Sequence, residues 1–592
     1  MAEGAAELVT SRPTRPMPFV GDVPAADLAI CAYAVGLLVV WSPGLNAGLL
    51  TPRTALAYVA TGPGLVVLAG LARRGDRAAR WAVAFLVVAF ASAVSSGAAR
   101  ISLLGSYQQD RGWIYLAAAL GAWALGRRLG PAGRRLLPAA VLAGVAVNVV
   151  MAFLEAITKP LTGPLVSVSG RVQGLAPESL FLGGYVAGGL ALAALLVSGR
   201  GRHWYAWLVG VVAFTAVDDL TGSRGALVAG LVLALIAPVV AIGRADRRRV
   251  AVRTGAIAVA IVVGFLLSGP LASTDASGAG RLGSSARVGG LDARVTMWKA
   301  GAAAVVDRPV LGYGPGRFRV ATSARTTAAF TRSEGPDRLY FDAHNVAVEQ
   351  LVTTGVLGLV AIAGFAWCAA RAARGPMAWF AVGVAATWLL EPVSVSTGPV
   401  ALLALGAAST ILTPAPREHD ERRVRPAALA GVFLAAAGLL AGSCLVAADA
   451  LIHQGVQGVR VDRIRAAQRL LPPDAVLSDL EAQLDGSIAR LGPAPRLRHA
   501  AIAASRRTVR LDPTRPLWWT NLGFAEGDLG FGSKREVLAR SERAFREGLR
   551  LNPWSVAAMD GLRRIALARG DAAEARSWAR RMCEAGSCPP KG

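Results

Sequence analysis

The sequence predicts an all-α fold: a polytopic membrane helical bundle followed by a soluble helical domain. Hydrophobic residues make up 54% of the 592 residues, and the mean hydropathy is +0.46, which a water-soluble fold of this size has no reason to reach. Apolar segments of about the length of a membrane span recur along most of the chain. From about Leu451 onward, the sequence becomes rich in Arg and Glu and keeps a helical period.

The chain is strongly basic, with 63 Lys and Arg against 38 Asp and Glu and a formal net charge of +25. A nucleic-acid-binding protein is not favoured, because the cations are spread over short loops that flank apolar runs. The polar start, M-A-E-G-A-A-E-L-V-T-S-R-P-T-R-P, and the absence of a cleavage site after the first apolar run argue against a signal peptide. We expect residues 1–24 to form a cytoplasmic tail.

Thirteen apolar segments are predicted to span the membrane, each near the length that a bilayer requires. Their approximate ranges are 25–42, 54–72, 80–97, 112–126, 136–157, 178–198, 204–220, 225–243, 251–269, 346–370, 377–391, 398–413 and 427–449. The segment at 112–126 is short, so the expected number of spans is about 12 or 13. Together they define a predicted membrane domain over residues 25–450.

The distribution of arginine predicts the topology of these spans. With a cytoplasmic N-terminus, every arginine-rich connection falls on the inside of the membrane, and the opposite short loops carry far fewer cations. The arginine-rich connections contain Arg73, Arg74, Arg77 and Arg80; Arg127, Arg128, Arg134 and Arg135; Arg200 and Arg202; Arg244 and 247–249; Arg371 and Arg374; and Arg417, Arg422, Arg423 and Arg425. One missed helix would invert the later pattern, so its regularity supports the count. It places the 270–345 loop and everything after Ala450 outside.

Residues 451–592 are predicted to form an extracytoplasmic domain of tetratricopeptide-like helical hairpins. Pro473, Pro513 and Pro553 recur every 40 residues, in the contexts L-L-P-P, L-D-P and L-N-P. A degenerate helical bundle is the alternative, and either would serve as a docking or scaffolding module for a protein partner. Cys583 and Cys588 lie in this exported segment, where a local disulfide is permitted.

The 270–345 loop is the longest interruption among the apolar segments. It reads D-A-R-V-T-M-W-K from Asp292, D-R-P-V-L-G-Y-G-P-G-R-F from Asp307 and D-A-H-N from Asp342. Such a loop between two spans is more often a working surface than a linker. The G-Y-G-P-G run lacks the strand, the Lys and the helix of a phosphate-binding loop, so we interpret it as a tight turn.

Four separated segments place cations or a titratable ring on the predicted outer face. They carry Arg171 in S-G-R-V-Q-G, Arg224 in T-G-S-R-G-A, Arg294 in D-A-R-V-T-M-W, and His344 in D-A-H-N. Arginine presents a planar fork that suits phosphate oxygens and stays charged at any working pH. An outer site built from several such forks would suit a lipid-linked diphosphate.

These motifs, as an ordered set, resemble the O-antigen ligase and O-antigen polymerase superfamily. The resemblance rests on T-G-S-R-G-A, on R-x-x-x-W followed by P-V-L-G-Y-G-P-G-R-F, and on H-N-V-A-V-E-Q-L-V-T-T-G-V-L-G-L, over roughly residues 140–400. It implies a membrane glycosyltransferase of the GT-C class. Such an enzyme takes a glycan from undecaprenyl diphosphate and joins it to an acceptor outside the cytoplasmic membrane, in the assembly of cell-surface polysaccharide. The extra terminal span and the repeat-like tail depart from the simplest members.

By this resemblance, Arg224, Arg294 and His344 match the functional positions of the family. The arginines would stabilise the departing diphosphate, and His344 would either accept the proton of the acceptor hydroxyl, with inversion at the anomeric carbon, or bind phosphate. As substrate-binding residues we predict Arg171, Arg317, Trp298, Tyr313 and Asn345. Structural alternatives are interfacial anchoring for Arg171, helix capping for Arg224 and His344, and ion pairing with Asp292 or Asp307 for Arg294.

No metal or cofactor is predicted. The first outer loop, S-P-G-L-N-A-G-L-L-T-P-R, has no carboxylate that could hold a divalent cation. Asp218 and Asp219 are adjacent rather than spaced as a D-x-D pair, and we expect them to cap a helix or to pair with Arg224.

Two other classes of function are compatible with many helices and external cations. A transporter or flippase of lipid-linked sugars should show inverted repeats and polar groups deep within its spans, and neither is clear in the sequence. A scaffold that acts through its C-terminal domain would not need thirteen predicted spans. Whether the enzyme is a ligase or a polymerase depends on the acceptor, about which the sequence is silent.

Overall fold

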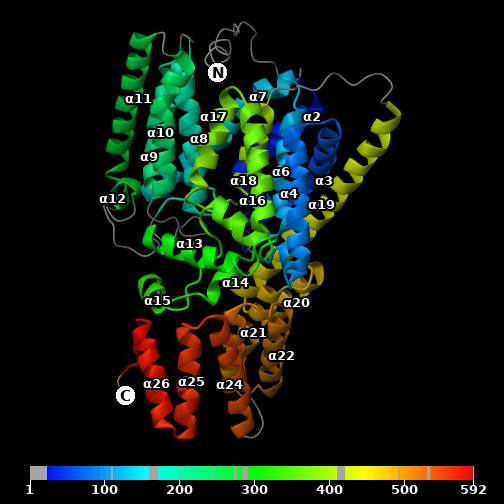
Figure 1. The fold of residues 1–592 in the computed structure, drawn as a ribbon, viewed down its shortest axis with the longest axis vertical. Helices are drawn as coiled ribbons and strands as arrows, with labels where there is room; N and C mark the ends of the chain where they lie inside the picture. The colour runs from blue at the N-terminus through cyan, green and yellow to red at the C-terminus, as the bar shows by residue number, and fades with distance from the viewer. Residues whose placement is uncertain are drawn as a thin grey trace.

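The computed structural model describes residues 23–107, 111–158, 171–199, 201, 203–243, 246–272, 277–282, 291–409, 421–491, 494–529 and 534–590 (Figure 1). The described residues form α-helices joined by turns and loops, with one isolated antiparallel bridge between Ala373 and Ser409. The predicted all-α fold is confirmed. The predicted cytoplasmic tail lies almost wholly outside the described residues.

Each of the thirteen predicted spans coincides with a helix. Within the described part of the chain, eight helices are long and apolar enough to cross a membrane: α3 (Thr51–Arg73), α4 (Arg77–Ser95), α7 (Pro131–Thr158), α8 (Ser179–Ser198), α10 (Arg224–Ile242), α11 (Arg247–Ser268), α16 (Val346–Ala372) and α19 (Glu421–Gln457). The other five predicted spans are shorter helices: α2 (Ala25–Val39), α6 (Trp113–Arg128), α9 (Ala206–Leu220), α17 (Pro376–Thr387) and α18 (Thr397–Ala408). The protein is therefore a multi-pass membrane protein.

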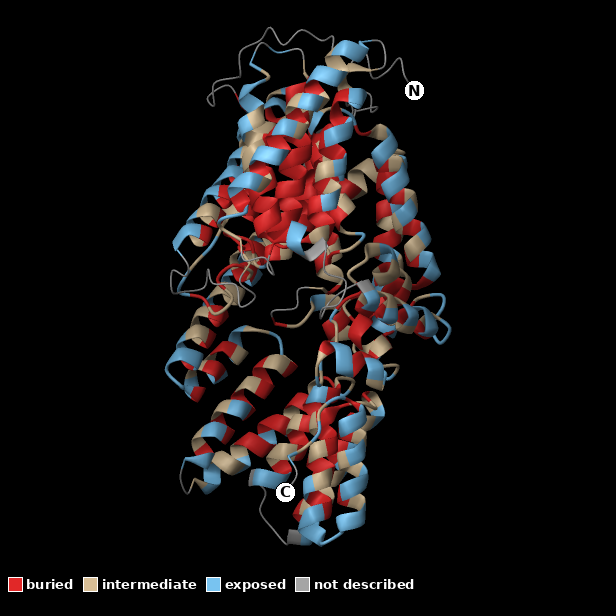
Figure 2. Cartoon of the chain, turned by 90° about the vertical axis from the view of Figure 1, so that its left-hand side faces the viewer, coloured by how far each residue is buried: buried red, intermediate tan, exposed pale blue. Residues whose placement is uncertain are grey.

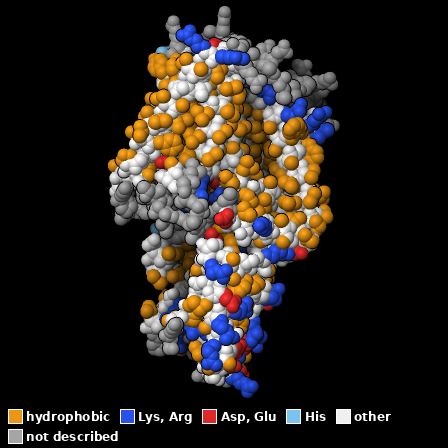
Figure 3. All heavy atoms as spheres, turned by 60° about the vertical axis from the view of Figure 1, so that its left-hand side comes forward, with side chains coloured by type: hydrophobic (Ala, Val, Ile, Leu, Met, Phe, Trp, Pro, Cys, Tyr) orange, Lys and Arg blue, Asp and Glu red, His pale blue; other side chains and the backbone are white. Residues whose placement is uncertain are grey.

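The bundle is apolar both inside and outside, as a bilayer requires. Its central helices are buried (Figure 2), and α8 packs so closely on α17 that a Cβ on Gly188 would lie 2.7 Å from Val384. Large apolar side chains face outward on the peripheral helices, such as Val209, Leu266 and Phe433, each about 70% exposed. Hydrophobic side chains cover the sides of the bundle in the space-filling view, as expected of a lipid-facing surface (Figure 3).

The arginine-rich connections meet at one end of the bundle. Arg74, Arg77, Arg127 and Arg371, from three of these connections, line a common cavity of about 670 Å³. Arg134 donates hydrogen bonds to the carbonyls that end α18, at 2.7 Å and 2.8 Å. These three connections therefore lie together as the sequence predicts, while the topology of the other spans and the compartment that each end faces stay predictions.

The opposite end carries short helices and the long loop. These helices are α5 (Ala99–Leu104), α12 (Gly278–Leu282), α13 (Leu291–Val305), α14 (Phe318–Ser323) and α15 (Ala328–Glu334). In Figure 1, α13, α14 and α15 lie between the bundle and the C-terminal helices, and α12 lies at the end of α11.

A break in α16 fixes this loop to the bundle. Gly355 has a left-handed backbone (φ +69°), which interrupts the hydrogen bonds of the helix. The G-Y-G-P-G turn replaces them: the backbone N–H groups of Tyr313 and Gly314 donate to the carbonyls of Val352 and Thr353 at 3.0 Å and 2.8 Å. The N–H of Val356 donates in return to the carbonyl of Pro309. The tight turn predicted from the glycines is confirmed, and its role is to complete a broken helix.

The C-terminal helices are packed in successive pairs. After α20 (Val461–Leu470), the pairs are α21 (Ala475–Arg490) with α22 (Pro495–Leu511), α23 (Pro516–Leu529) with α24 (Lys534–Leu551), and α25 (Val556–Arg569) with α26 (Ala572–Glu584). The prolines of the predicted 40-residue period precede each pair. The identity of these pairs as tetratricopeptide repeats stays a prediction. So do the domain limits, and the boundary placed at residue 450 falls inside α19.

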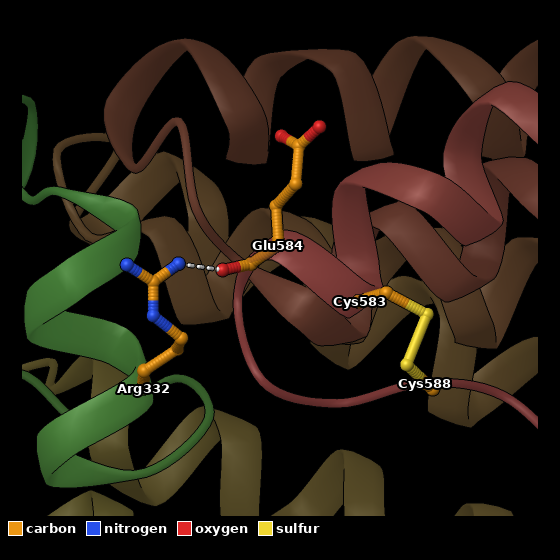
Figure 4. Close-up of a disulfide and its surroundings, with 4 residues drawn as sticks. All are labelled: Arg332, Cys583, Glu584 and Cys588. Atoms are coloured by element: carbon orange, nitrogen blue, oxygen red, sulfur yellow. Dashed lines mark hydrogen bonds between the residues drawn. A yellow bond between two sulfur atoms is a disulfide. The ribbon is translucent and has the colours of Figure 1, made fainter.

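The loop and the C-terminal helices hold one another through specific bonds. Asp337 accepts hydrogen bonds from the hydroxyl of Ser555, at 2.6 Å, and the backbone N–H of Ala557, at 2.9 Å, and so caps α25. Arg332 donates to the carbonyl of Glu584, beside the disulfide that Cys583 forms with Cys588 (Figure 4). The C-terminal domain is therefore docked on the loop of the membrane domain.

The kink in α16 gives a test of this architecture. Replacing Gly355 by Ala should lower the free energy of unfolding by at least about 2 kcal/mol, because a side chain disfavours positive φ and its Cβ would lie 2.2 Å from the carbonyl oxygen of Val310. The measurement is the thermal unfolding of the purified protein in detergent. Gly255→Ala is the control, since a Cβ there meets nothing within 4 Å. Equal melting temperatures for the two variants would refute this account of the kink.

Candidate functional site

The D-A-H-N segment forms a sharp turn into α16. Asn345 is the N-cap of the helix: its Oδ1 accepts the backbone N–H groups of Ala347 and Val348 at 3.0 Å and 3.1 Å, while its Nδ2 donates to the carbonyl of Leu389. His344 has a left-handed backbone with φ +49°, an uncommon conformation for a residue other than glycine. Asn345 is thus engaged in capping and in joining α16 to the α17–α18 connection.

His344 is held by a buried carboxylate. Nδ1 of its ring lies 2.5 Å from Oδ1 of Asp342, which also accepts the backbone N–H of His344 at 2.8 Å. The other oxygen of Asp342 pairs with Arg111, from the segment between α5 and α6. Tyr340 meets the imidazole edge to face, with ring centroids 5.6 Å apart. With Nδ1 at the carboxylate, Nε2 is the ring nitrogen left for a substrate.

The charge of Asp342 is fixed by its neighbours. Burial alone would raise its pKa, but Arg111 and His344 together hold the pKa of this carboxyl well below its usual range. Asp342 is therefore a carboxylate at any pH at which the protein would work. It orients the imidazole while Arg111 neutralises its charge.

Three arginines predicted from separate segments act on one another across this end of the bundle. Burial lowers the pKa of Arg171, and Arg224 and Arg294 lower it further by repulsion. Burial likewise lowers the pKa of Arg294, which also feels Glu391, Tyr340 and Arg224. The structure thus brings Arg171, Arg224 and Arg294 into one electrostatic cluster near Asp342 and His344.

A buried glutamate lies within this cluster. Glu391, in the connection between α17 and α18, is 3% exposed and accepts a hydrogen bond from the hydroxyl of Ser223, the N-cap of α10. Burial raises its pKa to about 8, although Arg294 and Arg171 favour its charged form. Arg224 follows directly after Ser223 at the N-terminal end of α10, so the helix places it beside Glu391.

A cavity of about 450 Å³ connects the polar groups to the interior of the bundle. Its polar end is formed by Arg111, Asp342, His344, Asn345 and Glu391. The rest is apolar and is lined by side chains of α4, α6, α16, α17 and α18, among them Phe85, Leu120, Ile362, Phe365 and Leu402. The cavity is therefore amphipathic, with charges at one end and a hydrocarbon-like wall along the remainder.

Of the predicted site residues, His344 and Asn345 line this cavity, whereas Arg171, Arg224 and Arg294 are not among its lining residues. Trp298, Tyr313 and Arg317, which were predicted to bind substrate, have structural partners instead. Trp298 donates its indole N–H to the carbonyl of Ala343 at 2.7 Å and so supports the backbone beside His344. Tyr313 donates its hydroxyl to Asp307 at 3.0 Å. Arg317 is buried at the C-terminal domain, where it pairs with Asp512.

Sequence reasoning missed Arg111, Asp342 and Glu391 as site residues. Asp342 lies two residues before His344, and Glu391 is a carboxylate between two apolar runs, so both had a signal in the sequence. The interpretation of the aspartate pair is only partly supported. Asp219 accepts hydrogen bonds from Ser268 and the backbone of Ala279, whereas the carboxylate oxygens of Asp218 are buried without a hydrogen bond among the described residues.

No three His, Cys, Asp or Glu side chains in the described ranges gather in a way that could hold a metal ion. That the protein uses no metal ion stays a prediction.

Comparison with known proteins gives one match. Residues 209–363 match the family model described as O-antigen ligase, which covers Arg224, Arg294 and His344 but neither Arg171 nor Glu391. A search of curated proteins found no significant match. The chain is thus a multi-pass helical membrane protein in which residues 209–363 are similar to the O-antigen ligase family.

Proposed function

We propose that the protein is a membrane glycosyltransferase that transfers a glycan from undecaprenyl diphosphate to an acceptor on the outer face of the cytoplasmic membrane. The observation that carries this proposal is the amphipathic cavity, whose charged end holds His344 and whose apolar length lies among membrane helices. A polyprenyl diphosphate has the same division between a charged head and a hydrocarbon tail. The family match over residues 209–363 agrees with this substrate class.

The arginine cluster supplies the diphosphate site. Arg224 and Arg294 repel Arg171, and Arg224 repels Arg294, while Glu391 attracts both Arg171 and Arg294 and Asp342 attracts Arg294. An incoming diphosphate would relieve this excess of positive charge and accept hydrogen bonds from the guanidinium forks. When the bond from the anomeric carbon to the diphosphate oxygen breaks, the leaving group gains negative charge, and the same forks stabilise it.

His344 acts on the acceptor in this mechanism. Its Nε2 takes the proton of the acceptor hydroxyl while that oxygen attacks the anomeric carbon, and the bonding electrons leave with undecaprenyl diphosphate. Attack opposite to the leaving group inverts the anomeric configuration. Arg111 neutralises the charge of Asp342, and the same carboxylate contacts Nδ1 and so orients the imidazole.

Two observations support an outer location for this site. The arginine-rich connections share the other end of the bundle, which the positive-inside rule assigns to the cytoplasm. The Cys583–Cys588 disulfide lies in the domain docked at the site's own end, and disulfides persist in oxidising compartments (Figure 4). The C-terminal domain would then stand outside the membrane, where it could receive an acceptor or a protein partner.

The first test is transfer activity in vitro. Purified protein, a synthetic undecaprenyl-diphosphate glycan and a panel of lipid-linked, protein and polysaccharide acceptors should give elongated or ligated product with and without a chelator. His344→Ala should lower the rate by about 10²–10⁴-fold, the usual contribution of a general base. Arg294→Ala should lower it by about 10²–10³-fold through the loss of leaving-group stabilisation.

Arg325→Ala is the matched control for both variants. It lies in the same loop and pairs with the half-exposed Asp307, so its removal should leave the rate within about twofold, as for an exposed ion pair. Unchanged activity in His344→Ala would refute the mechanism. No turnover with any acceptor would favour a transporter of lipid-linked sugars.

The pH dependence of the KM for the donor should report the ionisation of Glu391. As the pH rises through about 8, this carboxyl loses its proton, the net positive charge of the cluster falls, and the KM for the diphosphate donor should rise. Glu391→Gln should keep the KM at its lower value across this range, because an amide does not ionise. The measurement is the donor KM from pH 6.5 to pH 9.5 in both proteins, at a saturating acceptor concentration. A rise of equal size in Glu391→Gln would exclude Glu391 as its source.

A further inference from the structure

A second group of arginines lies where the long loop meets the C-terminal domain. The buried Arg317 and Arg319 enter it from the loop, and the half-buried Arg515 enters from the connection before α23. Asp512 pairs with Arg317, and Asp512, Asp479 and Asp474 attract Arg515. None of these residues lines the amphipathic cavity of the proposed donor site.

The bonds of Asp512 are already committed. Its Oδ1 accepts from Arg317 at 3.4 Å, from the hydroxyl of Thr514 at 2.5 Å and from the backbone N–H of Thr514 at 3.3 Å. Arg317 also donates to the hydroxyl of Thr514. Arg317 therefore pairs with Asp512 and Thr514, although its Nε is also buried without a hydrogen bond. Arg319 and Arg515 donate no side-chain hydrogen bond to a carboxylate among the described residues.

Arg319 and Arg515 are stacked on aromatic rings but donate no side-chain hydrogen bond among the described residues. The guanidinium carbon of Arg319 lies 3.2 Å from the centroid of Phe341, and that of Arg515 lies 4.0 Å from the centroid of Trp518 and 5.9 Å from that of Phe341. Arg319 is only 9% exposed, and its Nε is buried without a hydrogen-bond acceptor, as is that of Arg515. Each guanidinium group stacks on a ring through its plane, so the N–H groups along its edge can donate to another acceptor.

Buried charges in proteins are normally paired, because transfer of an unpaired ion out of water is costly. The burial of Arg319 lowers its pKa well below the usual value, and repulsion from Arg515 and Arg111 lowers it further, with only partial relief from Asp512 and Asp342. Two guanidinium groups from two domains lie beside the ring of Phe341, and their N–H groups suit the oxygens of one phosphate or carboxylate.

We propose that Arg319 and Arg515 bind an anionic group of the acceptor, a phosphate or a carboxylate, at the junction of the loop and the C-terminal domain. This proposal rests on the proposed function. Phe341, on which Arg319 stacks, directly precedes Asp342, the carboxylate that holds His344. An anion bound there would lie beside the residue that precedes Asp342 and apart from the residues that line the donor cavity. It would bring an acceptor hydroxyl toward the base and give the C-terminal domain a direct part in the choice of acceptor.

The test of binding uses inorganic phosphate as the probe. In the full-length protein in dodecyl maltoside, the ³¹P resonance of phosphate should broaden in the presence of the wild type and of His344→Gln. The broadening should fall by at least about tenfold in Arg319→Gln and Arg515→Gln, as expected for the loss of a charge-assisted hydrogen bond. Arg319→Lys keeps the charge and should retain part of it. Competition by acetate would identify a carboxylate as an equally good ligand, and its failure would favour phosphate.

Arg325→Gln is the matched control, since this arginine of the same loop pairs with Asp307 at the surface. Thermal unfolding of every variant shows whether it is folded. Equal broadening in wild type, Arg319→Gln and Arg515→Gln would overturn the proposal. So would a loss of broadening in His344→Gln alone, which would assign the phosphate to His344.

The transfer assay separates this proposal from the proposed function. Arg319→Gln should raise the KM for an acceptor that bears phosphate or carboxylate by at least about tenfold, with the KM for the donor unchanged. A neutral acceptor of the same length should show no such increase. If the wild type transfers no glycan to any acceptor while phosphate still binds through Arg319 and Arg515, the glycosyltransferase assignment fails and the anion site stands.

Discussion

The buried carboxylate of Asp342 is the group on which the arrangement of this site depends. It pairs with Arg111 from one part of the membrane domain and with His344 from another, and it accepts the backbone N–H of His344 as well. A buried carboxylate with these partners stays ionised, and removing Arg111 would leave it without its neutralising charge in a place with little water. The same interaction therefore positions the imidazole and joins the long loop to the segment before α6.

The backbone around this carboxylate is also held by specific hydrogen bonds. The break in α16 at Gly355 is completed by the turn at residues 309–314, and the N-terminal end of the helix is capped by Asn345, which also reaches the α17–α18 connection. Glu391 lies in that connection and bonds Ser223 at the start of α10. Through these few bonds, the elements that carry His344, Glu391 and Arg224 are held in register, as a preorganised polar site requires.

The C-terminal domain is part of this arrangement. Its helices hold the loop through Asp337 at α25, through Arg332 at the tail beside the disulfide, and through Arg317 at Asp512. Arg319 and Arg515 meet in the same interface around Phe341. A chain of contacts therefore runs from the paired helices to the residue next to Asp342, which gives a domain outside the bundle a physical route to the chemistry inside it.

The membrane-spanning helices could be predicted from the sequence because lipid imposes a length and an apolar composition on each one separately. Once the spans were placed, the arginine-rich connections could be assigned to one side. The glycines of the G-Y-G-P-G run predicted a tight turn from local sequence alone. The gathering of Arg171, Arg224 and Arg294 was expected from the side of the membrane that all three were predicted to share.

The residues that complete the site could not be predicted in this way. Arg111 and Glu391 acquire their roles from partners more than 150 positions away in the chain. Arg317, which resembled a phosphate ligand, is committed to Asp512. Local composition determined the helices and the predicted topology. Tertiary packing decided the partner of each buried charge, because two charges are desolvated as a pair only when the folded chain buries them side by side.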